Sequence, residues 1–230
     1  TCPDTLCENA PFQVKNISTG VINNYYWNFA TGNLVDRPDP VLSENLGVID
    51  VMNPNRGNPI RLALAQDGNK YYLFYSAYAP AKNIIRITFN GSYLDPSPTV
   101  DSIPNTVLLG SPTIQGISIK YDNVLGEWFG FYVTNRAASA TGYWLVGDLM
   151  RIDFGNSLSN DPLPSDIHRI DSIDGHLLFP QGMDIVWDPA VNKWYLMVGH
   201  TTNFDNGSPP WSFARYEFAN TLTVIPTYTK

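Results

Sequence analysis

Residues 182–199 read GMDIVWDPAVNKWYLMVG, and this stretch decides the fold. Its first part alternates between apolar and other residues up to Asp188, and after a short turn an aromatic, almost continuously apolar segment begins at Lys193. Alternation with a period of two is typical of a β-strand with one buried face, and aspartate is a common turn residue. The stretch therefore predicts two antiparallel strands joined by a tight turn.

The same pattern occurs twice more in the chain. Residues 60–76 read IRLALAQDGNKYYLFYS, and residues 116–133 read GISIKYDNVLGEWFGFYV. Each of the three units continues with a third predicted strand, in which an arginine stands three residues before a phenylalanine, and these arginines recur at intervals of 65 and 64 residues. A period this regular, with length differences confined to loops, indicates a repeat architecture.

With a short outer fourth strand in each unit, we expect an all-β fold, a β-propeller-like array of four-stranded antiparallel blades. Residues 25–34 align with the third strand, turn and outer strand of a repeat, which gives about three blades and a partial N-terminal blade. The predicted segments are 1–47 for the N-terminal part and, within 48–230, about 48–110, 111–178 and 179–230 for the three repeats. Because propellers close with about four to eight blades, further blades from the same longer protein or from another copy are expected.

The composition agrees with short strands and many turns. The chain has 17 Gly and 18 Pro but only six Lys and four Glu, and 13% of its residues are aromatic. Few good helix formers and many turn and strand formers argue against helices. The net charge of −7 argues against a nucleic-acid partner. Since no apolar run is long enough to span a bilayer, we expect no membrane insertion.

Two segments resemble known families. Residues 12–20 (FQVKNISTG) and 26–32 (YWNFATG) are similar to the strand, turn and Trp-Asn-Phe pattern of polycystic-kidney-disease-type (PKD) modules. The repeats, with RIDFGNSLSNDP at 151–162 as the clearest copy, resemble propeller repeats of very large secreted surface proteins of gliding and adhesive bacteria, or of a phage-borne relative. The resemblance implies surface display, adhesion or assembly, and it provides no catalytic residues.

The main functional expectation is a non-catalytic module for adhesion or assembly that lies outside the cell, on the cell surface or on a virion. Its expected partner is a glycan or a protein surface. Loops on repeat scaffolds commonly carry binding sites, and exposed aromatic rings can stack on sugars or anchor a protein. The candidate ligand-binding residues are Tyr143, Trp144, Phe204 and Trp211. The alternative for these rings is that they fold back and cover blade edges.

A propeller-type glycoside hydrolase is the competing hypothesis, and a structural subunit of a filament or virion is a third. Glycoside hydrolysis needs a pair of carboxyl groups with different protonation states. Asp184 breaks the repeat, because its counterparts are Leu62 or Ala63 and Ser118. It is therefore the candidate catalytic carboxylate, and its alternative role is in a polar channel wall or as the partner of an arginine.

Other polar residues recur once per repeat, which favours structural roles over a single site. We expect the recurring aspartates to cap turns and the recurring arginines to pair with a neighbouring blade's aspartate or backbone carbonyls. These residues are Asp67, Asp122, Asp188, Arg86, Arg151 and Arg215. Cys2 and Cys7 are expected to form a local disulfide in an oxidising compartment. The histidines lack zinc-site spacing, so neither a metal nor another cofactor is expected.

Overall fold

The computed structural model describes residues 58–78, 84–104, 106–108, 114–137, 145–172, 176–201 and 211–229. The chain divides into two units, Thr1–Gly47 and Val48–Lys230, and all described residues belong to the second. The predicted Cys2–Cys7 disulfide, the PKD-like segment and the partial N-terminal blade lie outside the described residues.

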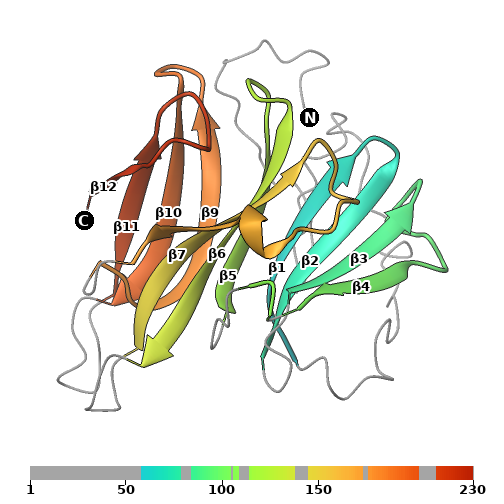
Figure 1. Cartoon of the computed structure of the whole chain (residues 1–230), viewed down its shortest axis with the longest axis horizontal. Coiled ribbons are helices and arrows are strands. Elements are labelled where there is room, and N and C mark those ends of the chain that lie inside the picture. The colour runs from blue at the N-terminus through green and yellow to red at the C-terminus, as the bar shows by residue number, and fades with distance from the viewer. Residues whose placement is uncertain are drawn as a thin grey trace, which may run out of the picture. The chain divides into compact units, whose positions relative to one another are not determined.

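Three four-stranded antiparallel blades follow one another along the chain (Figure 1). Blade A contains β1 (Asn58–Asp67), β2 (Lys70–Tyr78), β3 (Ile84–Asn90) and β4 (Thr99–Ile103). Blade B contains β5 (Ile114–Asp122), β6 (Glu127–Ala137), β7 (Leu145–Gly155) and β8 (Ile167–Asp171), with a 3₁₀ turn, η2 (Pro164–Asp166), before β8. Blade C contains β9 (Leu178–Asp188), β10 (Lys193–Thr201), β11 (Trp211–Phe218) and β12 (Thr227–Thr229). The prediction of an all-β, propeller-like array is confirmed.

Each blade pairs its strands in chain order, and one bridge between Val146 and Leu178 joins β7 to β9. The first strand of each blade is the innermost, so that β5 packs between β1 and β9. The described part of the chain contains no helix able to cross a membrane.

Tight turns join the first and second strands of each blade, at the places that the aspartates mark in the sequence. Each turn contains a residue with positive φ, which is Gly68, Gly126 or Asn192. This left-handed conformation costs little for glycine and is tolerated by asparagine. The turns therefore form where the sequence pattern places them.

The hydrophobic core lies between blades. Tyr72 and Phe74 of blade A pack in one cluster with Ile152 of blade B, and Phe131 of blade B packs in a second cluster with Leu196 of blade C. Blade B is thus buried on both faces. An almost continuously apolar second strand predicts such burial in every blade. For β10 of blade C this prediction is wrong, because Met197 is 39% exposed. No blade among the described residues covers that face.

Close approach between blades B and C requires a glycine at position 147. The Gly147 amide donates a hydrogen bond of 2.7 Å to the Leu177 carbonyl, and a Cβ at this position would lie 2.6 Å from Pro180 Cγ. We expect Gly147→Ala to lower the free energy of unfolding by about 2 kcal/mol, because the added methyl group would overpack the contact with Pro180. Urea denaturation measures this loss. Gly182→Ala is the matched control, since the atom nearest to a Cβ at position 182 would be 3.9 Å away. Equal midpoints for the two variants would contradict the packing described.

Candidate functional site

Asp184 lies on β9, the innermost strand of blade C. It stands four residues before Asp188, and the equivalent positions in blades B and A hold Ser118 and Ala63. Because β5 and β9 are neighbours, the carboxylate of Asp184 reaches the side chains of β5. The residue that breaks the sequence repeat thus places a carboxylate on the inner wall of the array. The Asp184 side chain is 74% exposed.

Three donors contact one oxygen of this carboxylate, Oδ1. The Ser118 hydroxyl donates to Asp184 Oδ1 at 2.9 Å, the Ile185 amide donates to the same oxygen at 2.8 Å, and Lys120 Nζ lies 3.2 Å away. Partial burial raises the pKa of Asp184, but the hydrogen bonds from Ser118 and Ile185 and the charge of Lys120 outweigh it and hold the pKa below its usual value. Asp184 is therefore ionised at neutral pH.

A second polar group on the same wall comes from blade A. Arg61 of β1 donates from Nε to the Gln181 carbonyl at 2.5 Å and from Nη2 to Gln181 Oε1 at 3.2 Å. Gln181 precedes Asp184 by three residues on β9. We call Arg61, Ser118, Lys120, Gln181 and Asp184 the inner-strand site. It combines an ionised carboxylate with several hydrogen-bond donors, a set that can bind hydroxyl groups and accept a proton.

The recurring aspartates do more than close turns. Asp122 Oδ1 does accept the Val124 amide of its own turn at 2.9 Å, but its Oδ2 accepts the Leu222 amide of blade C at 2.8 Å. Likewise Asp67 Oδ2 of blade A accepts the Leu158 amide of blade B at 3.0 Å. Each of these aspartates therefore holds the turn after the third strand of the next blade.

The recurring arginines hold the same turns from the other side. Arg86 Nη1 donates to the Leu158 carbonyl at 2.9 Å, and Arg151 Nη1 donates to the Leu222 carbonyl at 3.0 Å. We call such an aspartate–arginine pair, with both polar groups of one leucine between them, a clasp. One clasp joins blade A to blade B and another joins blade B to blade C. The predicted pairing of the arginines with backbone carbonyls of a neighbouring blade is thus observed for Arg86 and Arg151. The sequence did not show that the aspartate of the same blade holds the amide of the same leucine.

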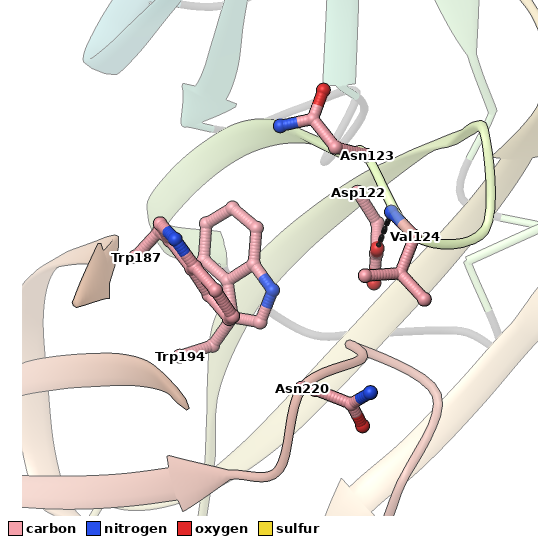
Figure 2. A pocket seen from close by; sticks show the side chains of 6 residues that line it. All are labelled: Asp122, Asn123, Val124, Trp187, Trp194 and Asn220. Atoms are coloured by element: carbon pink, nitrogen blue, oxygen red, sulfur yellow. Dashed lines mark hydrogen bonds between the residues drawn. The ribbon is translucent and has the colours of Figure 1, made fainter. Parts of the chain in front are cut away.

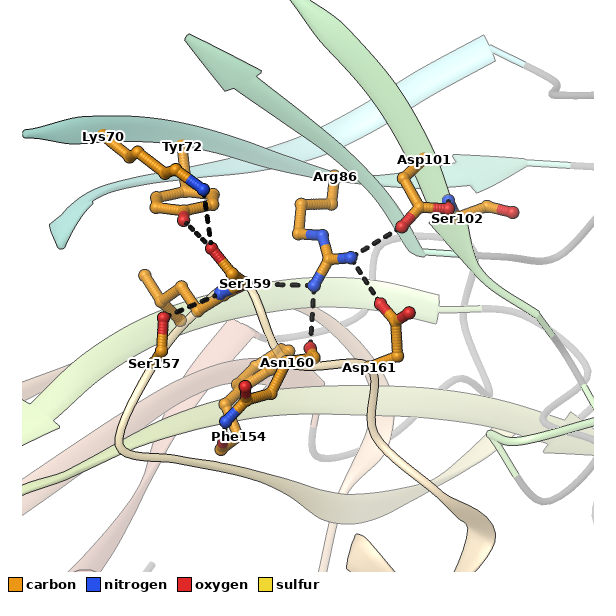
Figure 3. A network of polar contacts seen from close by, with 11 residues as sticks. Lys70, Tyr72, Arg86, Asp101, Ser102, Phe154, Ser157, Ser159, Asn160 and Asp161 are labelled. Atoms are coloured by element: carbon orange, nitrogen blue, oxygen red, sulfur yellow. Dashed lines mark hydrogen bonds and ion pairs between the residues drawn. The ribbon is translucent and has the colours of Figure 1, made fainter. Parts of the chain in front are cut away.

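Arg86 makes the larger network of the two (Figure 3). Its guanidinium also donates to the Asn160 carbonyl at 2.8 Å, to Asp101 of its own blade at 2.6 Å and to Asp161 of blade B at 2.5 Å. Arg151 pairs instead with Asp153 of its own blade, at 2.6 Å from its Nε. Arg215 and Asp188, the equivalent pair of blade C, hold no turn of another blade among the described residues.

Of the four aromatic residues expected to bind a ligand, the structure describes one. Trp211 begins β11 with 57% exposure, and its ring centroid lies 6.4 Å from that of Phe179. Phe179 has a positive φ of 48°, which is a strained conformation for a bulky residue. Tyr143, Trp144 and Phe204 lie outside the described residues.

Two histidines pair with aspartates. His176 Nδ1 lies 2.7 Å from Asp171 Oδ2 and its ring stacks on Tyr228 at 4.0 Å, while the Tyr216 hydroxyl donates to the same Asp171 oxygen at 2.8 Å. Burial, then the hydrogen bond to Asp171, raises the pKa of Tyr216, which therefore stays a donor. His168 lies 3.1 Å from Asp153. The described residues include no group of three or more metal-ligating side chains of the His, Cys, Asp or Glu type.

A hollow of about 280 Å³, open mouth included, lies between blades B and C (Figure 2). Two tryptophans of blade C, Trp187 and Trp194, form one wall with ring centroids 5.3 Å apart, and Asn123, Val124 and Asn220 lie around the rest. The carboxylate in it, Asp122, is buried and bonded to backbone amides on both oxygens. It is part of a clasp, so the inner-strand site is the better candidate for chemistry.

Comparison with known proteins gives a fold likeness and no family. No protein-family model and no curated protein matches the chain. The structure is similar to an α-L-arabinofuranosidase from Lactobacillus brevis, with a TM-score of 0.50, 15% identity, and coverage of 76% of this chain and 55% of that chain. A GH43_1 enzyme from Xanthomonas citri in complex with xylose gives a TM-score of 0.48, 7% identity, and coverage of 76% and 56%. The chain spans about half the length of these structures.

This comparison corrects the main functional expectation. The sequence was interpreted as a non-catalytic adhesion or assembly module, but a solved structure with a similar arrangement of strands is an α-L-arabinofuranosidase, a glycoside hydrolase. The interpretation was wrong because it rested on local motifs and on exposed loops, which many propellers share whatever they do.

Proposed function

We propose that the chain is part of a propeller-type glycoside hydrolase and that Asp184 is a catalytic carboxylate of its active site. The observation that carries the proposal is the environment of Asp184. Only the third of the three repeats has an acid at this position, and this carboxylate lies on the inner wall with three donors that keep it ionised. Structural residues of this array recur in each blade, whereas Asp184 does not.

An ionised carboxylate can serve as the general base or the nucleophile of glycoside hydrolysis, and it stabilises the positive charge of the oxocarbenium-like transition state. It cannot donate the proton that the leaving group needs, so the acid in this proposal is a different residue. Ser118 and Lys120 position Asp184 and hold its charge. Arg61 and Gln181 present donors and an acceptor to sugar hydroxyls on the same wall.

The substrate class we propose is a glycan that carries arabinofuranosyl groups. One similar protein of known structure is an α-L-arabinofuranosidase by name. The direct assay is release of 4-nitrophenolate from 4-nitrophenyl α-L-arabinofuranoside, with the β-D-xyloside and the β-D-glucoside as comparisons. We expect turnover of the arabinofuranoside above that of the other two. Hydrolysis of the glucoside alone would contradict the substrate class, and hydrolysis of none would contradict the function.

The pH dependence of the reaction tests the role of Ser118 and Lys120. Because the pKa of Asp184 lies below its usual value, the carboxylate stays ionised as the pH falls, and activity is expected to persist into acid solution. Ser118→Ala and Lys120→Met each remove a group that lowers this pKa, so the acid limb of the pH–rate profile should move to higher pH. Ser165→Ala, which changes an exposed serine within η2, is the control. An acid limb that stays in place in both variants would contradict the assigned role.

A further inference from the structure

The outer face of blade C carries an unused copy of the clasp. Asp188 Oδ1 accepts only the Ala190 amide of its own turn among the described residues, at 2.9 Å, and Arg215 lies over the Tyr195 ring at 5.8 Å. Arg215 is exposed, whereas Arg86 and Arg151 are each only 6% exposed. Asp188 and Arg215 therefore occupy the positions of a clasp, but they do not hold a leucine turn as the clasps of blades A and B do.

Apolar side chains around Arg215 are exposed in the same way. Met197 is directly paired with Arg215 in the sheet and is 39% exposed, and Phe213, on the same strand as Arg215, is 68% exposed. The equivalent residues of blade B, Phe131 and Leu149, are fully buried under blade C. The exposed residues of blade C therefore lie on the face that, in blades A and B, is covered by the next blade.

We propose that this face, made of Val186, Asp188, Met197, Phe213 and Arg215, binds a further four-stranded blade of the same repeat. The turn after the third strand of this blade would have the same four-residue form as the turns in the two occupied clasps. The first residue of that form is small, the second is Asn, the third is Ser or Thr, and the fourth is Leu. Those turns are residues 155–158 and 219–222. The Leu amide would donate to Asp188 and the Leu carbonyl would accept from Arg215.

Blade A of a second copy fits this face less well. Its turn at residues 90–94 is one residue longer than the other two and holds Tyr93 before Leu94. The Tyr93 hydroxyl donates to the Ala65 carbonyl of its own blade, and blade A already buries Tyr75, Ile85 and Phe89 in a cluster of their own. A self-associated ring is thus the competing outcome of the experiment below.

The face includes the row of Asp184, because Asp184, Met197 and Arg215 are paired across β9, β10 and β11. In the existing array, Ser118 of blade B stands beside Asp184 of blade C. A docked blade would place the equivalent residue of its own first strand beside Asp184. The inference itself rests on packing and hydrogen bonding, and it is independent of the proposed hydrolysis.

The test is an extended chain that carries a second copy of residues 172–230 after Lys230. In this copy Asp184→Ser restores the residue of blade B and avoids two adjacent carboxylates. The measurement is the shift of the thermal midpoint caused by Arg215→Ala in the original third repeat, in the extended and in the unextended chain. Arg151→Ala in the unextended chain is the reference for an occupied clasp, and sedimentation shows the state of association.

We expect Arg215→Ala to cause little shift in the unextended chain, and in the extended chain a shift similar to that of Arg151→Ala. Replacement of the clasped leucine in the appended copy, Leu222→Asp, should abolish this difference. Equal shifts for Arg215→Ala in both chains would overturn the proposal, as would an appended copy that remains unfolded by circular dichroism. A monomer–dimer equilibrium of the unextended chain that Arg215→Ala abolishes would overturn it in favour of a second copy.

Discussion

Arg86→Ala is expected to lower the free energy of unfolding by about 3 kcal/mol, because a buried donor that bonds to the next blade is removed. The Arg86 side chain is only 7% exposed, and it donates to the carbonyls of Leu158 and Asn160 in the next blade. Its two carboxylate partners, Asp101 and Asp161, are 55% and 81% exposed, so water screens those pairs. Most of the loss comes from the buried Leu158 carbonyl, which is left without a donor.

Urea denaturation of Arg86→Ala, Arg151→Ala and Arg215→Ala measures this contribution at three equivalent positions. Arg215 is the matched control because it is exposed and contacts no other blade among the described residues. We expect a large loss for Arg86, a smaller loss for Arg151 and almost none for Arg215. The same loss at all three positions would show that the arginines act within their own blades.

The strands of the three blades could be predicted because their signal is local and repeated. The first strand of each blade alternates in character and ends at an aspartate, and β1, β5 and β9 end at Asp67, Asp122 and Asp188. The aspartates could also be recognised as structural from their recurrence. Their partners could not, since Asp122 and the Leu222 amide are 100 residues apart and meet only when blades B and C pack.

In the sequence, the candidate site could be recognised only because one of its residues departs from the repeat pattern. Asp184 stood out because its position in the other repeats has no acid, but periodicity carries no information on which side chain lies beside it. Ser118 and Lys120 became its partners because β5 is the inner neighbour of β9. Arg61 of β1 likewise reaches Gln181 of β9, although 120 residues of sequence separate them. Such contacts depend on how the blades are arranged, and no local pattern encodes them.

Asp184→Asn is expected to reduce the rate of glycoside hydrolysis by about 10³-fold, which is within the range for removal of a general base. Asparagine keeps the shape of the side chain but can neither accept the proton nor carry the negative charge. Asp95→Asn is the matched control: its pKa is also lowered, by the amides of Asn90 and Ser97, and it lies in an exposed turn of blade A. The control should keep full activity.

The catalytic role of Asp184 is tested most directly by the release of arabinose from arabino-oligosaccharides, quantified by chromatography. The proteins compared are the unmodified chain, Asp95→Asn and Asp184→Asn. Circular dichroism of the three proteins establishes that they are equally folded. We expect equal release by the first two and a loss of about 10³-fold in Asp184→Asn alone. Release that is unchanged in Asp184→Asn would contradict the assignment of Asp184 as a catalytic carboxylate.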